Sequence, residues 1–556
     1  MRTDSVAWFV RHGRQLLVGC LLTFVTLGLG IASDAAGAEQ SSPVQARPKI
    51  GLVLAGGGAK GAAHVGVLKV IEQLRIPIDY VVGTSMGSIV GGLYASGMTP
   101  HEIQRAIEEI DWNDLFVDVP GRTDRSFRRK TDDALYLFKA RPGFSDGAIK
   151  LPLAYIQGQK FDLQLNRLTQ RVVTVHDFDK LPIPFRAVAA DLETGAEVVL
   201  KSGNLARSIR ASMAVPGAFD PVELDGKLLV DGGIANNIPV SVAREMGADV
   251  LIVSELGTAM LTRKEITSGL DVAAQMVNFL FVINSRQQLE TLSLRDVRIS
   301  VELGEIGAGS FDRVKETIPL GEQAAKNATE ELRRYSLSEQ NYRVHTAART
   351  PTNAELPRIE FVRIENKSGV SDEVIAHYIS AKKGEPLDVA NLEHDIQQIY
   401  GLEIFDSVRY EVVEENGQSG LVVRTNAKPW GPGYLQTGLI TSSNFSGDAA
   451  FRLGVTYTRT AINPLNGEWR TGLQIGDEPT VFTELFQPFD PGARYFGFGR
   501  VAYQTRNVNT FDDKGRKTAE LHASGPGIEV GAGRQFGTWG EVRLGYLRRT
   551  GNIEVG

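Results

Sequence analysis

The sequence predicts an α/β domain, followed by a small α+β domain and then by a transmembrane β-barrel. Three observations lead to this prediction. From Pro48 to about Tyr335, short apolar runs alternate with helical patterns, which is typical of α/β layers. Residues 356–428 follow the order strand, helix, helix, strand, strand. From residue 429 to residue 556, apolar residues alternate with polar or small ones, as on strands with two different faces.

Length and composition narrow the class of protein. A chain of 556 residues is too long for one hydrophobic core, so about three domains are expected. Its 42% hydrophobic and 23% charged residues are ordinary for a globular protein. The net charge of −6 gives no indication of nucleic acid as a partner.

A targeting segment is predicted at residues 1–38. Three arginines precede an apolar run at residues 16–31, and Ala36-Gly37-Ala38 is a small-x-small cleavage site. We expect a signal peptide that is removed after residue 38. Leu-Val-Gly before Cys20 also fits a lipoprotein signal, but the main apolar run follows that cysteine. An uncleaved membrane anchor is a third option, although the apolar run is short for a membrane span. Because Cys20 is the only cysteine, the mature protein would have no disulfide.

Two glycine-rich turns carry the expected chemistry of the α/β domain. A buried strand from Ile50 leads into Gly56-Gly57-Gly58-Ala59-Lys60-Gly61, and a second, Tyr80-Val81-Val82, leads into Gly83-Thr84-Ser85-Met86-Gly87. Glycines can turn the backbone sharply and leave its N–H groups unblocked at a helix start. Gly-x-Ser-x-Gly is the spacing of a nucleophile elbow, in which the serine tops a strained strand-to-helix turn.

The first glycine run also fits the Gly-x-Gly-x-x-Gly pattern of dinucleotide-binding domains. That pattern wants an acidic residue about 20 residues further on, at the end of the second strand, whereas Asp79 precedes that strand. One βα unit apart, the two runs supply a nucleophile and a row of amide donors for an oxyanion. This combination favours acyl transfer, with ordinary glycine-rich turns as the remaining alternative.

A carboxylate is predicted at the end of another strand, where Lys227–Val230 runs into Asp231-Gly232-Gly233. Asp-Gly by itself is most often a turn. Upstream, residues 211–221 form a helix-to-loop stretch, Ala-Ser-Met-Ala-Val-Pro-Gly-Ala-Phe-Asp-Pro, that could line a pocket.

Taken in order, the motifs Gly-Gly-Gly-x-Lys-Gly, Gly-x-Ser-x-Gly, Ala-Ser-x-Ala-x-Pro and Asp-Gly-Gly resemble those of the patatin-like phospholipases over residues 48–335. The resemblance implies a three-layer α/β fold that hydrolyses lipid acyl esters without a metal or organic cofactor. It makes Ser85 the nucleophile and Asp231 the proton acceptor of a Ser–Asp dyad. It places the oxyanion hole at the backbone of Gly57, Gly58 and Ala59. Lys60 stands where many bacterial members have Arg or Lys, and it could steady the loop or meet phosphate.

The histidines of this region agree with a dyad. A Ser-His-Asp triad needs an imidazole beside the serine, whereas His64, His101 and His176 are each expected to be structural or to lie on the surface. Aspartate is a weak base at its ordinary pKa near 3.9, so burial would have to raise the pKa of Asp231. No metal-ligand cluster stands out in the sequence.

One basic stretch, residues 121–133, has two interpretations. Its five basic residues could meet anionic phospholipid head groups. Three aspartates dilute the charge and favour a solvated loop.

The rest of the chain is predicted to be a linker at residues 336–355 and two further domains. Residues 356–428 resemble a POTRA (polypeptide-transport-associated) domain, with an unspecialised α+β domain as the alternative. In the final region, residues 451–457 read Phe-Arg-Leu-Gly-Val-Thr-Tyr and residues 469–475 read Trp-Arg-Thr-Gly-Leu-Gln-Ile. Such strands suit a transmembrane barrel, although a soluble sandwich alternates similarly; the export signal favours the membrane.

The final region, residues 429–556, holds about eight predicted strands, the smallest usual closed barrel. It resembles the start of an outer-membrane surface-antigen barrel, so we expect the chain to be a fragment of its reading frame. The combined resemblance is to the patatin-type autotransporters of Gram-negative bacteria. It implies a phospholipase A-type acyl hydrolase at the cell outer membrane, with its catalytic domain surface-exposed or secreted.

Expected partners are a phospholipid or other acyl-ester lipid, the outer membrane and its barrel-assembly machinery. No nucleic acid is expected as a partner. A homodimer is possible. The alternative function is a non-catalytic outer-membrane assembly, secretion or adhesion protein whose α/β domain only binds lipid.

Overall fold

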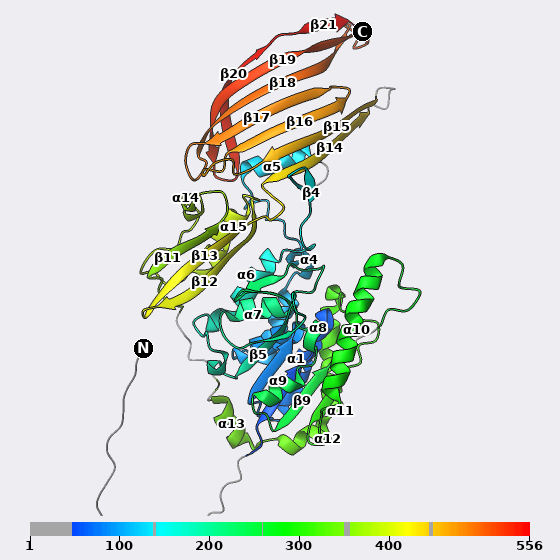
Figure 1. The fold of residues 1–556 in the computed structure, drawn as a ribbon, viewed down its shortest axis with the longest axis vertical. Coiled ribbons are helices and arrows are strands. Elements are labelled where there is room, and N and C mark those ends of the chain that lie inside the picture. The colour runs from blue at the N-terminus through cyan, green and yellow to red at the C-terminus, as the bar shows by residue number, and fades with distance from the viewer. Residues whose placement is uncertain are drawn as a thin grey trace, which may run out of the picture. The chain divides into compact units, whose positions relative to one another are not determined.

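The computed structural model describes residues 47–136, 141–257, 260–347, 349, 356–443 and 449–555. These residues contain three β-sheets, one for each of the three regions expected from the sequence, and a short hairpin at residues 143–150 of the first region joins the third sheet (Figure 1). The signal segment expected at residues 1–38 lies outside the described residues.

The first sheet builds the α/β domain. Its strand order is β10-β9-β1-β2-β5-β8-β7, with β6 paired to β5. The strands from β10 to β5 run parallel, and β6, β7 and β8 are antiparallel to their neighbours. Their bounds are β1 Ile50–Leu54, β2 Tyr80–Thr84, β5 Phe185–Asp191, β6 Glu197–Leu200, β7 Val222–Leu224, β8 Lys227–Asp231, β9 Val250–Glu255 and β10 Val297–Ser300.

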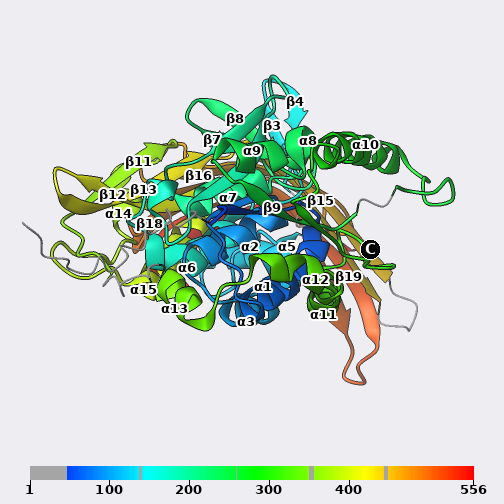
Figure 2. The ribbon, with the colours of Figure 1, turned by 90° about the horizontal axis from the view of Figure 1, so that it is seen from below.

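Helices cover both faces of this sheet, which confirms the three-layer fold. Ile50, Leu52 and Leu54 of β1 enter one core with α1, α2, α3, α7 and α11, whereas Val53 enters a second core with α9. Figure 2 shows α1, α3 and α11 on one side of the sheet and α9 and α10 on the other. The bounds are α1 Ala63–Gln73, α2 Met86–Ala95, α3 Pro100–Glu109, α4 Trp112–Leu115, α6 Gln159–Thr169, α7 Leu205–Ser212, α8 Gly233–Asn236, α9 Val240–Glu245, α10 Gly269–Leu289, α11 Val314–Asn327, α12 Thr329–Leu332 and α13 Glu339–Ala347. No helix in the described part of the chain has both the length and the apolar character needed to cross a bilayer.

The second sheet belongs to the small α+β domain and has the predicted element order. Strand β11 lies parallel to β13, which pairs antiparallel with β12. The helices pack on this sheet around a core that includes Ile375, Ile396 and Val423. The bounds are β11 Phe361–Lys367, α14 Asp372–Ala376, α15 Val389–Tyr400, β12 Phe405–Glu415 and β13 Gln418–Ala427.

The third sheet is antiparallel, and among the described residues it does not close on itself. Its strands are β14 Gly433–Ser443, β15 Ala449–Arg459, β16 Glu468–Gly476, β17 Thr480–Pro488, β18 Tyr495–Phe511, β19 Lys517–Phe536, β20 Gly540–Arg549 and β21 Asn552–Val555. Cross-strand pairing aligns Leu453 with Ile475 and Val455 with Leu473, and all four are 40–56% exposed. The opposite face carries Thr458, Arg470 and Glu484 in one row. The predicted alternation is therefore confirmed.

The basic stretch at residues 121–133 is neither a solvated loop nor an exposed lipid-binding patch. Helix α5, Phe127–Leu135, occupies much of it, and Arg125, Arg128 and Arg129 are buried. A short hairpin follows, β3 Gly143–Ser145 and β4 Ala148–Lys150, and β3 pairs with β14 of the third sheet. Both sequence interpretations were wrong because these arginines also pair with acidic residues far along the chain, at positions 403, 468 and 484, which the stretch itself does not reveal.

Candidate active site

Ser85 tops the turn between β2 and α2, as the Gly-x-Ser-x-Gly spacing predicts. Its backbone has φ 54° and ψ −125°, a left-handed conformation that non-glycine residues rarely adopt. The flanking glycines permit this turn: a Cβ at Gly83 would lie 2.3 Å from the Gly87 carbonyl oxygen, and one at Gly87 would lie 2.3 Å from the Leu54 carbonyl oxygen. The sequence therefore folds into a strained elbow that presents Ser85.

A second serine holds this elbow in place. Ser212, the last residue of α7, accepts a hydrogen bond at Oγ from the backbone N–H of Ser85 (2.9 Å). Its hydroxyl donates to the carbonyl oxygen of Val188 on β5 (2.5 Å). Residues 211–221 had been expected to line a pocket. The positioning role of Ser212 was missed, because the motif marks the residue and only the fold brings it to Ser85.

Asp231 ends β8 and meets the elbow. Its side chain is 1% exposed, and Oδ1 accepts a hydrogen bond from the N–H of Gly233 (2.8 Å). Burial raises the pKa of Asp231 to about 6, and hydrogen bonds from the Ser85 hydroxyl and the Gly233 N–H offset part of that rise. The structure thus brings Ser85 and Asp231 together. It also raises the pKa of the Asp231 carboxylate, which makes that group a stronger base.

Helix α10 supports the loop after Asp231 by contacts that the sequence did not indicate. Asn284 donates from Nδ2 to the carbonyl oxygens of Gly233 (2.7 Å) and Ile234 (3.1 Å), and its Oδ1 accepts from the N–H of Asn237 (3.0 Å). Gly232 packs so closely that a Cβ there would lie 2.1 Å from the Val188 carbonyl oxygen. The Asp-Gly-Gly motif is therefore fixed from two sides.

The first glycine run lies directly beside the elbow. Gly56 and Gly61 face Ser85 and Met86, since a Cβ at these glycines would lie 3.2 Å from Ser85 Cβ and 2.4 Å from Met86 Cγ. Gly58 has φ +56°, and a Cβ there would lie 2.3 Å from the Ala308 carbonyl oxygen. Only glycine fits this conformation and this approach.

Of the three expected oxyanion donors, one is occupied. The N–H of Ala59 donates to the Ala308 carbonyl oxygen (2.8 Å), so it is not available in this conformation. For the N–H groups of Gly57 and Gly58, no carbonyl partner is found within the described part of the chain. Gly58 starts a short 3-10 helix, whose first N–H groups have no partner within the helix.

Lys60 and His64 have structural partners. Lys60 donates from Nζ to the Gly257 carbonyl oxygen (2.5 Å), which steadies the loop, and burial lowers its pKa. His64 is fully buried between Ser254 Oγ (2.8 Å) and the Ala55 carbonyl oxygen (2.9 Å), and burial lowers its pKa to about 4. His64 is therefore neutral near pH 7 and acts as part of the core.

The other two histidines of the region lie outside the site's hydrogen-bond network. His101 is exposed in α3, and His176 is half-buried in a loop, where its carbonyl oxygen accepts from Gly203 N–H (2.7 Å). Across the ranges that the structure describes, no three histidine, cysteine or acidic side chains form a group that could hold a metal.

An open cavity of about 390 Å³ borders the site. Its lining includes Gly56, Asn237, Leu256, Val282 and Arg286, but neither Ser85 nor Asp231. Helix α10 forms one wall and carries a row of exposed apolar side chains on its other side: Val272, Met276, Phe279, Leu280 and Ile283, each 45–62% exposed. Apolar surface thus lies on the helix that holds the Asp231 loop.

Two family models match the chain. The model described as patatin-like phospholipase matches residues 52–244, and the POTRA model, described as surface antigen variable number repeat, matches residues 357–428. The chain therefore contains a patatin-like phospholipase domain and a POTRA domain, which confirms both resemblances seen in the sequence.

The curated relatives match part of the chain, 38–44% of its length. Patatin-like phospholipase domain-containing protein 6 of Homo sapiens is 34% identical over 214 residues, which are 38% of this chain and 13% of the relative. Lysophospholipase NTE1 of Mycosarcoma maydis is 35% identical over 209 residues, 38% of this chain and 10% of the relative. An uncharacterized NTE family protein of Mycobacterium tuberculosis is 31% identical over 248 residues, 44% of this chain and 60% of the relative. The chain thus spans less than two thirds of each relative, and only about a tenth of two of them.

Solved structures match at low similarity. VipD from Legionella pneumophila is 18% identical with a TM-score of 0.29, and the match covers 51% of this chain and 67% of that one. BamA from Haemophilus ducreyi is 12% identical with a TM-score of 0.26, and the match covers 34% of this chain and 35% of that one.

Proposed function

We propose that this protein hydrolyses lipid acyl esters with Ser85 as the nucleophile and Asp231 as the base. The observation that carries this proposal is the buried contact between the Ser85 hydroxyl and Asp231, at the top of a strained elbow. Strain at a buried polar residue is maintained where a function requires it. The 34–35% identity to a patatin-like phospholipase domain-containing protein and a lysophospholipase supports a lipid ester as substrate.

The reaction follows from the geometry. Ser85 Oγ attacks the ester carbonyl carbon while its proton passes to the Asp231 carboxylate. The carbonyl oxygen becomes an oxyanion that the N–H groups of Gly57 and Gly58 can stabilise. Asp231 then returns the proton to the departing alcohol, and an acyl-serine remains. Water then attacks the acyl carbon while losing a proton to Asp231. The bond from the acyl group to Ser85 breaks, the fatty acid leaves, and Asp231 returns the proton to Ser85 Oγ.

A lipid-binding domain without catalysis is the competing function. Such a domain would need apolar surface but neither a strained serine nor a buried aspartate whose ionisation is costly. Those two features favour the hydrolase.

The rate is expected to depend on Asp231 ionisation. A base must be unprotonated, so kcat/KM should be low below the folded-state pKa of about 6, rise through it and level off above it. Below that pKa, the expected loss is about tenfold per pH unit. The measurement is kcat/KM for a soluble short-chain ester between pH 4.5 and 8.5, with folding checked by circular dichroism. A rate that is flat from pH 4.5 upward, in protein that stays folded, would exclude Asp231 as the base.

The exposed apolar side of α10 is expected to contact the lipid surface. Replacing Met276 and Ile283 together by glutamine should lower hydrolysis of phospholipid in vesicles by roughly tenfold or more, because apolar area that would enter the lipid is lost. Hydrolysis of a soluble short-chain ester should be unchanged, since neither side chain touches the dyad. Val344, 69% exposed on α13, provides the control, and Val344→Gln should leave both rates unchanged. Equal losses on both substrates would argue against interfacial contact.

The location proposed for the protein is the outer membrane. The POTRA domain and the apolar outer face of the third sheet support an anchor inserted by the barrel-assembly machinery, after export directed by residues 1–38. A possible homodimer stays a prediction.

A further inference from the structure

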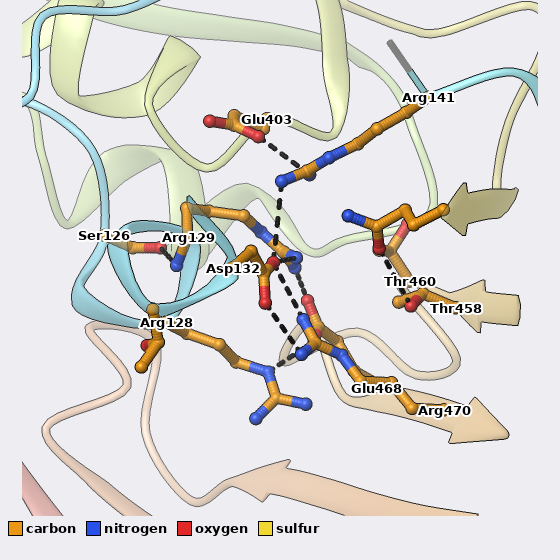
Figure 3. A network of polar contacts seen from close by, with 12 residues as sticks. Ser126, Arg128, Arg129, Asp132, Arg141, Glu403, Thr458, Thr460, Glu468 and Arg470 are labelled. Carbon is orange, nitrogen blue, oxygen red and sulfur yellow. Dashed lines mark hydrogen bonds and ion pairs between the residues drawn. The ribbon is translucent and has the colours of Figure 1, made fainter. Parts of the chain in front are cut away.

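Helix α5 of the catalytic domain is bound to the polar face of the third sheet. The side chains of Arg128 and Arg129 are 7% and 3% exposed, although both are charged. Arg128 pairs through Nε with Glu468 Oε2 (2.5 Å) and through Nη2 with Glu484 Oε1 (2.9 Å) (Figure 3 shows the Glu468 side of this network). Its guanidinium also lies 4.4 Å from the centre of the Phe486 ring.

The same interface continues through Asp132, whose side chain is 1% exposed. Asp132 pairs with Arg470 of β16 (Nη1 to Oδ1, 2.7 Å) and with Arg129 of its own helix (2.9 Å), and Arg129 also contacts Glu468 (Figure 3). Buried charges of both signs thus come from both sides and are paired. Because a buried charge that loses its partner is strongly destabilising, this surface favours a lasting contact over a transient one.

The POTRA domain joins the network at Glu403. Its carboxylate pairs with Arg125 (Nε to Oε1, 2.6 Å) and with Arg141 (Nη1 to Oε2, 2.7 Å), and both arginines belong to the catalytic domain. Side chains from all three domains therefore meet around α5.

A second contact does not depend on charge. The hairpin β3–β4 adds to the edge of the third sheet, where Gly143 pairs with Tyr434 and the Leu435 N–H donates to the Pro142 carbonyl oxygen (2.9 Å). We name residues 121–136 and 141–150 the anchor segment. The anchor segment contacts the sheet through ion pairs to β16 and β17 and through backbone pairing to β14.

The anchor segment and the POTRA domain contact the same end of the sheet. Lys130 Nζ donates to the Thr538 carbonyl oxygen (2.6 Å) in the turn between β19 and β20. The Ser371 N–H of the POTRA domain donates to the Pro464 carbonyl oxygen (2.9 Å) in the turn between β15 and β16. These two turns leave the same end of an antiparallel sheet. At the opposite end, β18 and β19 extend beyond β17 to a hairpin at residues 512–516.

We propose that the anchor segment tethers the catalytic domain permanently to the POTRA end of the membrane sheet, so that the domain is neither released nor carried across the membrane. The hairpin in which β18 and β19 project beyond β17 marks the outer side, because the long projections of outer-membrane barrels lie on their outer side. The catalytic domain then acts from the periplasm, on phospholipids of the inner-facing leaflet. This replaces the expectation of a surface-exposed or secreted domain. The proposal rests on the membrane location proposed above, and not on the catalytic chemistry.

The tether is tested by cutting the chain between the domains. A site for a specific protease is inserted within residues 350–355 of the full chain, which is purified in detergent and cut. The catalytic fragment should co-elute with the rest of the chain. With Glu468→Gln and Glu484→Gln combined, the buried arginines lose their partners, and the fragment should dissociate at a lower urea concentration than it does from the unaltered chain. Arg122→Gln, which alters a 70% exposed arginine of the same segment, should leave co-elution intact.

Separation of the fragment from the unaltered chain, or a double variant whose fragment dissociates at the same urea concentration as the unaltered one, would overturn the tether. The first of these results needs no variant, so a double variant that fails to fold leaves the proposal falsifiable. Ser85→Ala should not change co-elution, so loss of the proposed chemistry and loss of the tether are separate results.

The side of the membrane is tested with two protease sites in intact cells. One replaces the exposed turn at residues 225–226 of the catalytic domain, and the other replaces the hairpin at residues 512–516. Protease added outside should cut the hairpin site in intact cells, and should cut the catalytic-domain site only after the outer membrane is permeabilised. If the two sites are cut together, from outside or only after permeabilisation, the domain and the hairpin are not on opposite sides and the proposal is wrong.

Discussion

Replacing Ser85 by alanine should lower acyl-ester hydrolysis by a factor of about 10⁴ or more, because the variant keeps the fold but has no nucleophile. Asp231→Asn should be nearly as damaging, because the amide keeps the shape of the carboxylate and cannot accept the serine proton. The double variant should lose little beyond either single one, since nucleophile and base act as one unit. Initial rates of hydrolysis of a phospholipid and of a soluble ester are measured for the two single variants and the double variant.

Stability separates this catalytic loss from misfolding. The pKa of Asp231 is raised in the folded state, so its ionisation opposes folding above about pH 6. Asp231→Asn should therefore raise the free energy of unfolding by about 3 kcal/mol at pH 7.5, and this gain should shrink between about pH 6 and pH 4 and vanish below that. His64→Ala and His176→Ala serve as comparisons and should keep substantial activity where they fold. A folded histidine variant without turnover would contradict the dyad.

Arginine in place of Leu453 should impair membrane assembly strongly, because this side chain lies on the apolar face proposed to meet lipid. The expected penalty is about 2–4 kcal/mol near the bilayer centre. Gln474→Arg is the matched control, since Gln474 pairs next to Leu453 but lies on the opposite, polar face and is half-buried. Thr456 faces the same way as Gln474 but is only 5% exposed, so an arginine there would be crowded.

Assembly is read as outer-membrane fractionation together with heat-modifiable electrophoretic migration. Leu453→Arg should reduce both, and Gln474→Arg should leave them close to the unaltered chain. Equal assembly of the two variants would contradict the proposed orientation. Full solubility of the third sheet without detergent would contradict its membrane location.

The sequence predicted how the candidate site is built because each part of it is local. Gly83 and Gly87 mark the elbow around Ser85, and Asp231 ends a strand that the apolar pattern reveals. Periodicity likewise predicted the three sheets and the two faces of the third. These features depend on neighbouring residues, and neighbouring residues can be read along the chain.

The parts that could not be predicted depend on contacts between distant segments. Ser212 reaches the Ser85 N–H across 127 positions, and Arg128 meets Glu468 across 340. A solvated loop and a buried ion-pair network have similar composition, so residues 121–133 alone could not separate them. The occupied amide of Ala59 is a similar case, because its partner Ala308 belongs to a distant loop.

The central claim is that Ser85, activated by Asp231, is the nucleophile. Labelling with a fluorophosphonate probe, followed by mass spectrometry of the labelled peptide, tests it most directly. The unaltered full chain should carry one label at Ser85, formed faster above pH 6 than below it, and Ser85→Ala should carry none. Asp231→Asn should label far more slowly. Labelling at another residue with Ser85 unmodified, or ester hydrolysis that persists undiminished in Ser85→Ala, would contradict the mechanism.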